Sequence, residues 1–127
     1  ANDIIRKNSD IAYGSVEQLS ILTGDVGVFV NVRGTSANTT IKTQDKDDFF
    51  FISSDANQDS SNAASLESLP GWLDYVEGDL HVVAGEGRNQ LFISDERSDV
   101  TTENTNGVIL TNSSLTQIGE GLGNIFF

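Results

Sequence analysis

The sequence contains no cysteine and no methionine among its 127 residues. Without cysteine, a disulfide framework and a thiolate metal site are both excluded. No run of 18 apolar residues occurs, so no membrane-spanning helix and no membrane insertion are expected. A chain of this length predicts one domain.

Basic residues are also few, with 7 Lys and Arg against 19 Asp and Glu, which gives a formal net charge of −12. Nucleic-acid binding requires a basic surface, so nucleic acid is not an expected partner. The same charge disfavours anionic membrane surfaces. It favours repulsion between copies and an affinity for divalent cations, of which calcium is the candidate cofactor.

Proline occurs once, at Pro70, and no segment of ten residues keeps a helical 3.6-residue period. The apolar residues instead form short clusters that alternate with polar ones, as in Val28, Val30 and Val32. Each cluster is bounded by Gly, Asn, Asp, Ser or Thr, which are turn-forming residues. The sequence therefore predicts an all-β protein.

An internal repeat suggests how the strands are arranged. Residues 21–32 align with residues 41–52 at an offset of 20, and residues 41–53 align with residues 82–94 at an offset of 41. A short repeat of this length is typical of a solenoid. The repeat predicts a right-handed parallel β-helix with about 20 residues per coil, in which Val30, Phe50 and Leu91 occupy equivalent inward positions.

The longer offset indicates one coil plus an insertion. Residues 54–71 are rich in Ser, Asn and Asp and are interpreted as an inserted loop that bulges from the stack. Residues 1–127 are interpreted as one repeat unit, with residues 1–13 forming a junction with a preceding copy. This junction is suggested by a similarity between "SDIAY" (9–13) and "GNIFF" (123–127). The candidate junction residues are Asp10, Ile11, Tyr13, Asn124, Ile125 and Phe127.

Residues 30–56, 73–96 and 107–121 resemble the long repeats of very large secreted or surface proteins related to hemolysin-type calcium-binding arrays, and the resemblance covers roughly residues 13–127. The resemblance implies a parallel β-solenoid within a long extracellular polypeptide or fibre, with a structural or adhesive role. The calcium loop of that family follows G-G-x-G-x-D-x-apolar-x. Residues 84–92 keep Gly85 and Gly87 but have Asn89 in place of the Asp, and no loop keeps the full ligand set.

Two acidic turns are candidate metal sites. Asp45, Asp47 and Asp48 form the densest acidic cluster, and Glu86 and Asn89 occupy the matching turn. Hard carboxylate and amide oxygens are the ligands that calcium prefers. The alternative is that these residues lie in solvated turns or stack in a hydrogen-bonded ladder. If calcium matters, a chelator should lower the melting temperature.

The aromatic residues have two alternative roles, in binding or in packing. In a strand containing Phe50 as an inward residue, Phe49 and Phe51 point outward, and Phe29 and Phe92 occupy matching outward positions. These four residues (Phe29, Phe49, Phe51 and Phe92) form either an exposed contact stripe or a layer packed beneath the 54–71 insertion. Trp72, Tyr75 and Tyr13 could form a sugar-stacking platform; the alternative is that Trp72 covers an edge of the core under the inserted loop. Asn38 and Asn112 begin N-glycosylation sequons.

No catalytic constellation is evident. The carboxylates are scattered over turns, and His81 is the single histidine, without a nucleophile motif beside it. The sequence therefore predicts a non-enzymatic structural building block of an extracellular filament or cell-surface fibre, which associates with itself head to tail. The alternative is an adhesin domain that binds glycans or other surface proteins. In the filament hypothesis, Ile125→Asp should block lengthening and leave the unit folded.

Overall fold

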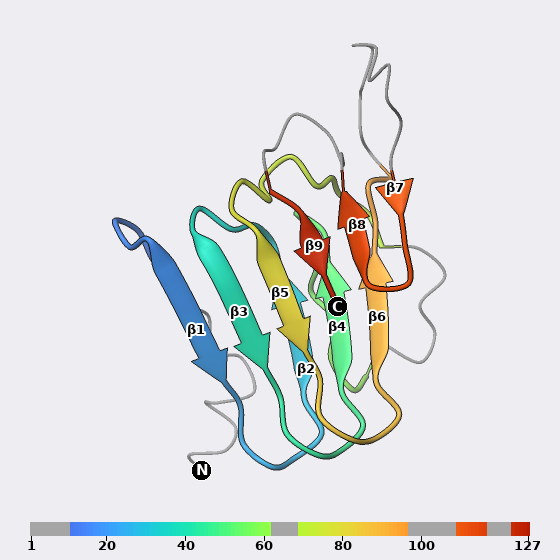
Figure 1. Cartoon of the computed structure of the whole chain (residues 1–127). Coiled ribbons are helices and arrows are strands. Elements are labelled where there is room, and N and C mark those ends of the chain that lie inside the picture. The colour runs from blue at the N-terminus through green and yellow to red at the C-terminus, as the bar shows by residue number, and fades with distance from the viewer. Residues whose placement is uncertain (1–10, 62–68, 97–108, 117–122) are drawn as a thin grey trace.

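The computed structural model describes residues 11–61, 69–96, 109–116 and 123–127, and strands are the only regular elements in these ranges (Figure 1). Where the residues before a strand are described, they include Gly, Asp, Asn or Ser. The strands are β1 (Gln18–Leu22), β2 (Phe29–Val32), β3 (Asn38–Lys42), β4 (Phe49–Ile52), β5 (Leu80–Val83), β6 (Gln90–Ile93), β7 (Ile109–Leu110), β8 (Ser114–Thr116) and β9 (Ile125–Phe126).

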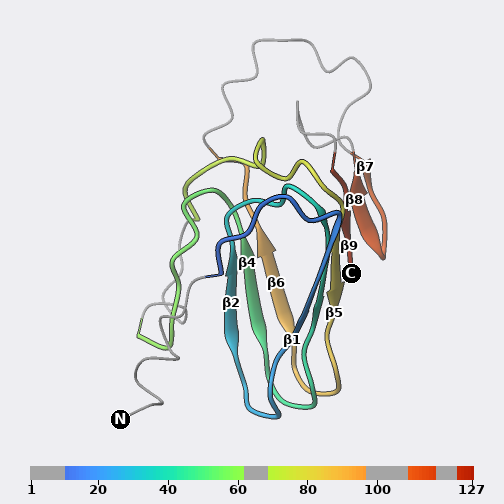
Figure 2. The same ribbon diagram turned by 90° about the vertical axis from the view of Figure 1, so that its left-hand side faces the viewer.

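The strands form two sheets that face each other (Figure 2). Sheet A contains six strands in the order β1-β3-β5-β9-β8-β7, and sheet B contains three in the order β2-β4-β6. Alternating apolar side chains from both sheets meet between them and exclude water. The buried residues of this core are Val32, Ile41, Phe50, Ile52, Leu73, Val76, Leu80, Val82 and Ile125.

The strand register follows the sequence repeat. Strands β1 and β3, and likewise β2 and β4, pair in parallel with an offset of 20 residues, so that Val30 lies opposite Phe50. Strands β4 and β6 pair with an offset of 41 residues, so that Phe50 lies opposite Leu91. Val30 and Leu91 both pack against the core that contains Phe50. The predicted register and the inward positions of these three residues are confirmed.

The predicted right-handed parallel β-helix is wrong, because sheet A is mixed and the two sheets differ in size. Strand β9 is parallel to β5, but β8 is antiparallel to β9, and β7 is antiparallel to β8. A tight hairpin accounts for the antiparallel pairing of β7 with β8, since the Thr111 N–H donates to the Ser114 carbonyl at 2.9 Å. The parallel order in sheet A therefore ends at β9. In sheet B the last described strand is β6.

The described part of the predicted insertion does not bulge from the sheets. Residues 54–61 lie on the side of sheet B that faces away from sheet A (Figure 2). The Asn31 side chain holds this segment by donating to the Gln58 carbonyl at 2.9 Å and accepting from the Gln58 N–H at 2.8 Å. Arg33 Nε donates to the Ala56 carbonyl at 2.8 Å. The segment is therefore a third layer over sheet B, and residues 62–68 lie outside the described residues.

Candidate functional site

Three turns connect sheet A to sheet B and stack on one another. They comprise residues 23–28, 43–48 and 84–89, which are equivalent by the offsets of 20 and 41 residues. Neighbouring turns are linked through their backbones, since the Lys46 N–H donates to the Glu86 carbonyl at 2.9 Å. Gly87 has a φ of 122°, which favours glycine, and a side chain there would collide with the Lys46 carbonyl.

The carboxylates of the middle turn accept hydrogen bonds from the next turn. Asp45 Oδ1 accepts from the Glu86 N–H at 3.2 Å, and Asp47 Oδ1 accepts from the Arg88 N–H at 2.8 Å. These bonds satisfy backbone donors that no sheet ladder reaches. The predicted metal ligands Asp45 and Asp47 therefore have a structural use in the turn stack, while the Glu86 side chain is exposed.

The second pair of candidate ligands forms a column at the start of sheet B. Asp48 Oδ1 accepts from the Val28 N–H, and Asn89 Oδ1 accepts from the Asp48 N–H, both at 3.0 Å. Asn89 also uses its amide group, since Nδ2 donates to the Gly85 carbonyl at 2.7 Å. Asp48 has an exposed fraction of 1%, and its Oδ2 has no hydrogen-bond partner among the described residues.

Asp48 and Asn89 occupy equivalent positions, but only Asn89 has an amide group that donates a hydrogen bond within its own turn. This difference leads to a prediction about stability. Gln44 is equivalent to Gly85, so an amide at position 48 can donate to the Gln44 carbonyl as Asn89 does to Gly85. Asp48→Asn should therefore raise the free energy of unfolding by about 1 kcal/mol, because a buried unpaired oxygen is replaced by a donor. Urea denaturation at pH 7 measures the change.

The matched control is Asn89→Asp, which removes the donor to the Gly85 carbonyl and should lower the free energy of unfolding by a similar amount. A neutral or destabilising effect of Asp48→Asn would show that the two turns differ in how they use this column.

No group of three or more His, Asp or Glu residues converges as a metal site within the described ranges. The turn residues repeat along the stack, so their side chains form columns and do not surround one point. The structure thus places all five predicted ligands in one turn stack but assembles no calcium ligand set from them there.

A second column lies at the other end of the sheet A strands, and sequence reasoning found only part of it. Asn38 Oδ1 accepts from the Asp79 N–H at 3.2 Å, and Asp79 Oδ1 accepts from the Asn124 N–H at 2.8 Å. The sequence marks Asn38 as a sequon residue and Asn124 as a junction residue, whereas Asp79 was missed. The signal that identifies this column is an Asn or Asp directly before the first inward residue of a strand, as Asn38 precedes Thr39, Asp79 precedes Leu80 and Asn124 precedes Ile125.

The predicted contact stripe is mostly a packing layer. Phe29 and Phe49 stack with ring centroids 4.9 Å apart, and Phe51 and Phe92 stack at 5.1 Å. All four point away from sheet A, as predicted. Phe51 is fully buried with Ala56 and Leu69, and the other three rings are half-buried against this cluster. Packing beneath the 54–71 segment is therefore the arrangement that the structure shows.

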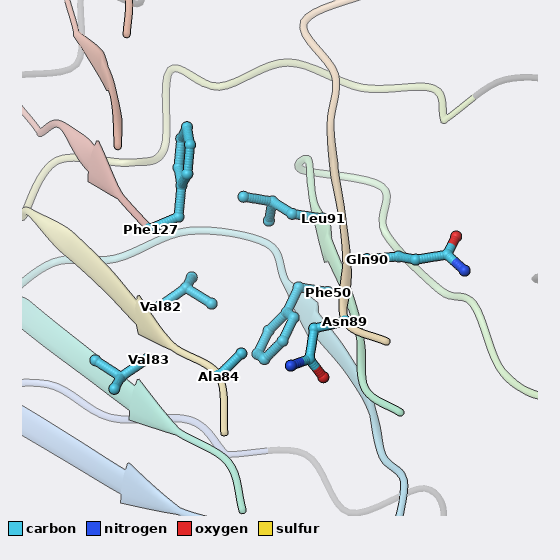
Figure 3. Close-up of a pocket in the computed structure, with 8 residues that line it drawn as sticks. All are labelled: Phe50, Val82, Val83, Ala84, Asn89, Gln90, Leu91 and Phe127. Carbon is cyan, nitrogen blue, oxygen red and sulfur yellow. The ribbon is translucent and has the colours of Figure 1, made fainter. Parts of the chain in front are cut away.

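The free edge of sheet B borders an apolar cavity of about 470 Å³ (Figure 3). Strand β6 has β4 on one side and no paired strand on the other in the described part of the chain. In Figure 3, Phe127, Leu91, Val82 and Phe50 surround the cavity, with Ala84 and Asn89 at its base. A strand edge without a partner, beside partly exposed apolar side chains such as Leu91 and Phe127, is a site at which another strand can add.

The predicted junction residues have different surroundings. Ile125 is fully buried in the core opposite Leu80, and Phe127 lines the cavity with an exposed fraction of 40%. Ile11 is exposed, and the Tyr13 hydroxyl accepts from the Ser36 N–H at 3.2 Å. Ile11 and Tyr13 are not in a strand, so they are not equivalent to β9. Asp10 lies outside the described residues.

Both sequon asparagines are exposed, with Asn112 in the turn between β7 and β8 and Asn38 at the start of β3. Trp72 and Tyr75 form an edge-to-face pair with ring centroids 5.8 Å apart, and Tyr75 is 54% exposed. His81 stacks on Phe126 at 4.7 Å on the outer face of sheet A. This contact gives the single histidine a packing role.

Searches against family models, curated proteins and solved structures found no match to this chain. Within the ranges described above, no helix is long and apolar enough to cross a membrane.

Proposed function

We propose that this chain is a structural building block of an extracellular filament or long cell-surface fibre. In such a fibre, units follow one another head to tail, as separate copies or as tandem copies in one polypeptide. The observation that carries the proposal is the edge of β6, which has no paired strand among the described residues and lies beside the apolar cavity. A neighbouring strand that pairs with this edge and covers the partly exposed Leu91 and Phe127 side chains would stabilise the unit.

The stacked turns support the same proposal. Side-chain acceptors bind the middle turn to the third through Asp45, Asp47 and Asn89, and the first turn to the middle one through Asp48. This arrangement extends along the stacking direction. A heterologous contact along one direction that does not close produces an open fibre. Because each unit carries a net charge of −12, units repel, and added salt should favour end-to-end contact by screening this charge.

The number of copies in one polypeptide provides a test. Chains with one, two and four copies should form rods whose length in electron micrographs increases in proportion to copy number. Light scattering of the single-copy chain between about 0.02 M and 0.5 M NaCl should show association that increases with salt. Copies that behave as independent beads on flexible connections, together with a single-copy chain that stays monomeric throughout, would contradict the structural role.

Glycan binding by an adhesin domain is a second candidate, favoured by the Trp72–Tyr75 pair. A half-buried indole beside an exposed phenol ring is an amphipathic surface on which a sugar can stack. In this alternative, Tyr75→Ala removes retention of the chain on immobilised glycans, whereas Val83→Ala, at another exposed site, does not. Equal retention of both variants would exclude this pair as the binding surface.

A further inference from the structure

The outward side of sheet A differs in charge from the segments that connect the strands. The chain has 19 Asp and Glu residues, yet the described strands contain none of them. Lys42 is the one charged side chain that a described sheet A strand directs outward, since its neighbour Ile41 points into the core. In Figure 1, which looks onto this side, no described segment crosses β1, β3 or β5. A chain with a net charge of −12 thus presents a broad face without carboxylates.

Two rows of side chains make up this surface, which we call the sheet A face. In one row, Leu22 lies in register with Lys42, and Lys42 lies in register with Val83. Leu22 is 68% exposed and Val83 is 44% exposed, so covering them would remove apolar surface from water and stabilise a contact. The second row carries no negative charge and consists of Ser20, Thr40, His81, Phe126 and Ser114.

The charge distribution decides which charged partners can use this face. A basic partner is attracted more strongly to the turns, where Asp45 and Asp47 are exposed, and an acidic partner is repelled by the chain as a whole. A second copy carries the same net charge, but two faces without carboxylates approach each other with less repulsion than two turn surfaces do. Charge therefore favours a second copy in face-to-face contact.

A neutral glycan fits the sheet A face less well. Sugars stack on the open face of an aromatic ring. The rings of His81 and Phe126 stack on each other, with centroids 4.7 Å apart and planes inclined by 13°. Because these residues are register partners in β5 and β9, the stack follows the row and the ring edges point away from the sheet. The apolar surface that remains is aliphatic, from Leu22 and Val83.

We infer that two copies of the chain pair side to side through their sheet A faces, with Leu22 and Val83 of each copy buried at the contact. This contact goes beyond the proposed function, which concerns contact along the stacking direction. Four strands about 4.8 Å apart and about 17 Å long give a face of roughly 300 Å² per copy, against the roughly 800 Å² of a standard interface. A single pair is therefore weak, and tandem copies pair more tightly because many such contacts act together.

NMR spectroscopy of the single-copy chain tests the pairing in about 0.5 M NaCl, where repulsion between copies is screened. With increasing concentration, the amide signals of Thr40, His81 and Val83 should shift together, with a Kd on the order of 1 mM. Leu22→Asp and Val83→Asp each place a carboxylate in the sheet A face and should raise this Kd at least about tenfold. The control is Val26→Asp, which adds the same charge in the 23–28 turn at a position that is 65% exposed, and it should change the Kd less than about twofold.

The size of the associated species separates this contact from a fibre contact. A two-fold contact closes at two copies, whereas head-to-tail contact continues to longer species. Association that stops at the dimer in light scattering, and that both face variants weaken but Val26→Asp does not, supports the inference. Such pairing by single copies, while four-copy chains behave as flexible beads, retains the inference and rejects the fibre.

Three results would overturn the pairing. The first is a parent chain that stays monomeric up to about 2 mM, a concentration at which a millimolar Kd gives substantial dimer. The second is association with signal shifts at Leu91 and Phe127 and no effect of Val83→Asp, which assigns the contact to the end of the unit. The third is a monomeric parent that an insoluble neutral polysaccharide retains and Val83→Asp releases, which assigns the sheet A face to a glycan.

Discussion

Ile125→Asp should unfold the chain. The Ile125 side chain has an exposed fraction of 0% and packs in the core opposite Leu80 and Leu115. A carboxylate at this position would be buried without a partner, and substitutions of this kind cost more than about 4 kcal/mol. Circular dichroism at 25 °C should show loss of the β signal. Parent-like thermal unfolding of the Ile125→Asp variant would show that β9 is not part of the core.

The control for this prediction is Ile125→Val, which removes one buried methyl group and should cost about 1 kcal/mol. The Ile125→Asp and Ile125→Val variants also show whether a substitution at Ile125 can be used to test assembly. A sequence-based hypothesis had Ile125→Asp blocking elongation without unfolding the unit. Its full burial makes that separation of effects impossible, so the exposed residue Phe127 is the better position for probing contact with another segment.

The repeat in the sequence was sufficient to predict strand register. Ile21 and Ile41, and likewise Val30 and Phe50, are placed side by side in the structure as the offset of 20 residues requires. The reason is that alternation fixes which side chains face the core, and a slip of one residue would turn every apolar side chain outward. Repeated turns of equal length then hold the two sheets at the same level.

The direction of the last strands was not predictable in this way. Alternation is the same for a parallel and an antiparallel strand, and residues 109–116 have no counterpart at the repeat offset. A short polar turn around Asn112 and Ser113 favours the local hairpin, since Thr111 and Ser114 close it through both backbone and side-chain bonds. Extending the repeat pattern to the end of the chain therefore produced the wrong fold class.

The acidic turns show why residue type alone did not define the site. Aspartate and asparagine oxygens accept hydrogen bonds from backbone N–H groups as readily as they bind a hard cation. The sequence located the relevant side chains in the same turns. Only the strand register shows that Asp47 lies next to the Arg88 N–H and Asn89 next to the Asp48 N–H. Accepting a backbone hydrogen bond and binding a cation both require an oxygen at the same position in the turn.

The aromatic residues were assigned to the outer face of sheet B correctly, but their exposure depends on the third layer. Residues 54–61 have almost no apolar periodicity, so their packing against the sheet could not be predicted from the pattern. Polar side chains fix them there, through the paired Asn31–Gln58 bonds and the bond from Arg33 to the Ala56 carbonyl. A polar segment can thus cover a hydrophobic face when a few hydrogen bonds position its one or two apolar residues.

Phe51→Ala should produce the largest loss of stability among substitutions outside the central core. The Phe51 ring is fully buried, stacks on Phe92 and packs against Ala56 and Leu69. Its removal leaves a cavity between sheet B and the third layer, and truncation of a buried phenylalanine costs about 3–5 kcal/mol. The free energy of unfolding from urea denaturation measures this loss directly. The half-buried Phe29 provides the comparison, and Phe29→Ala should cost clearly less.

The same two variants distinguish a structural layer from a detachable binding loop. If residues 54–61 are part of the folded unit, Phe51→Ala should increase cleavage within this segment by a nonspecific protease, because it removes the main apolar contact of the layer. Phe29→Ala should change the cleavage little, since the Asn31 and Arg33 hydrogen bonds to the segment remain. Rapid cleavage of the segment in the parent chain, with Phe51→Ala costing less than about 1 kcal/mol, would mean that the layer is not held against sheet B. Phe29, Phe49, Phe51 and Phe92 would then be available as a contact surface.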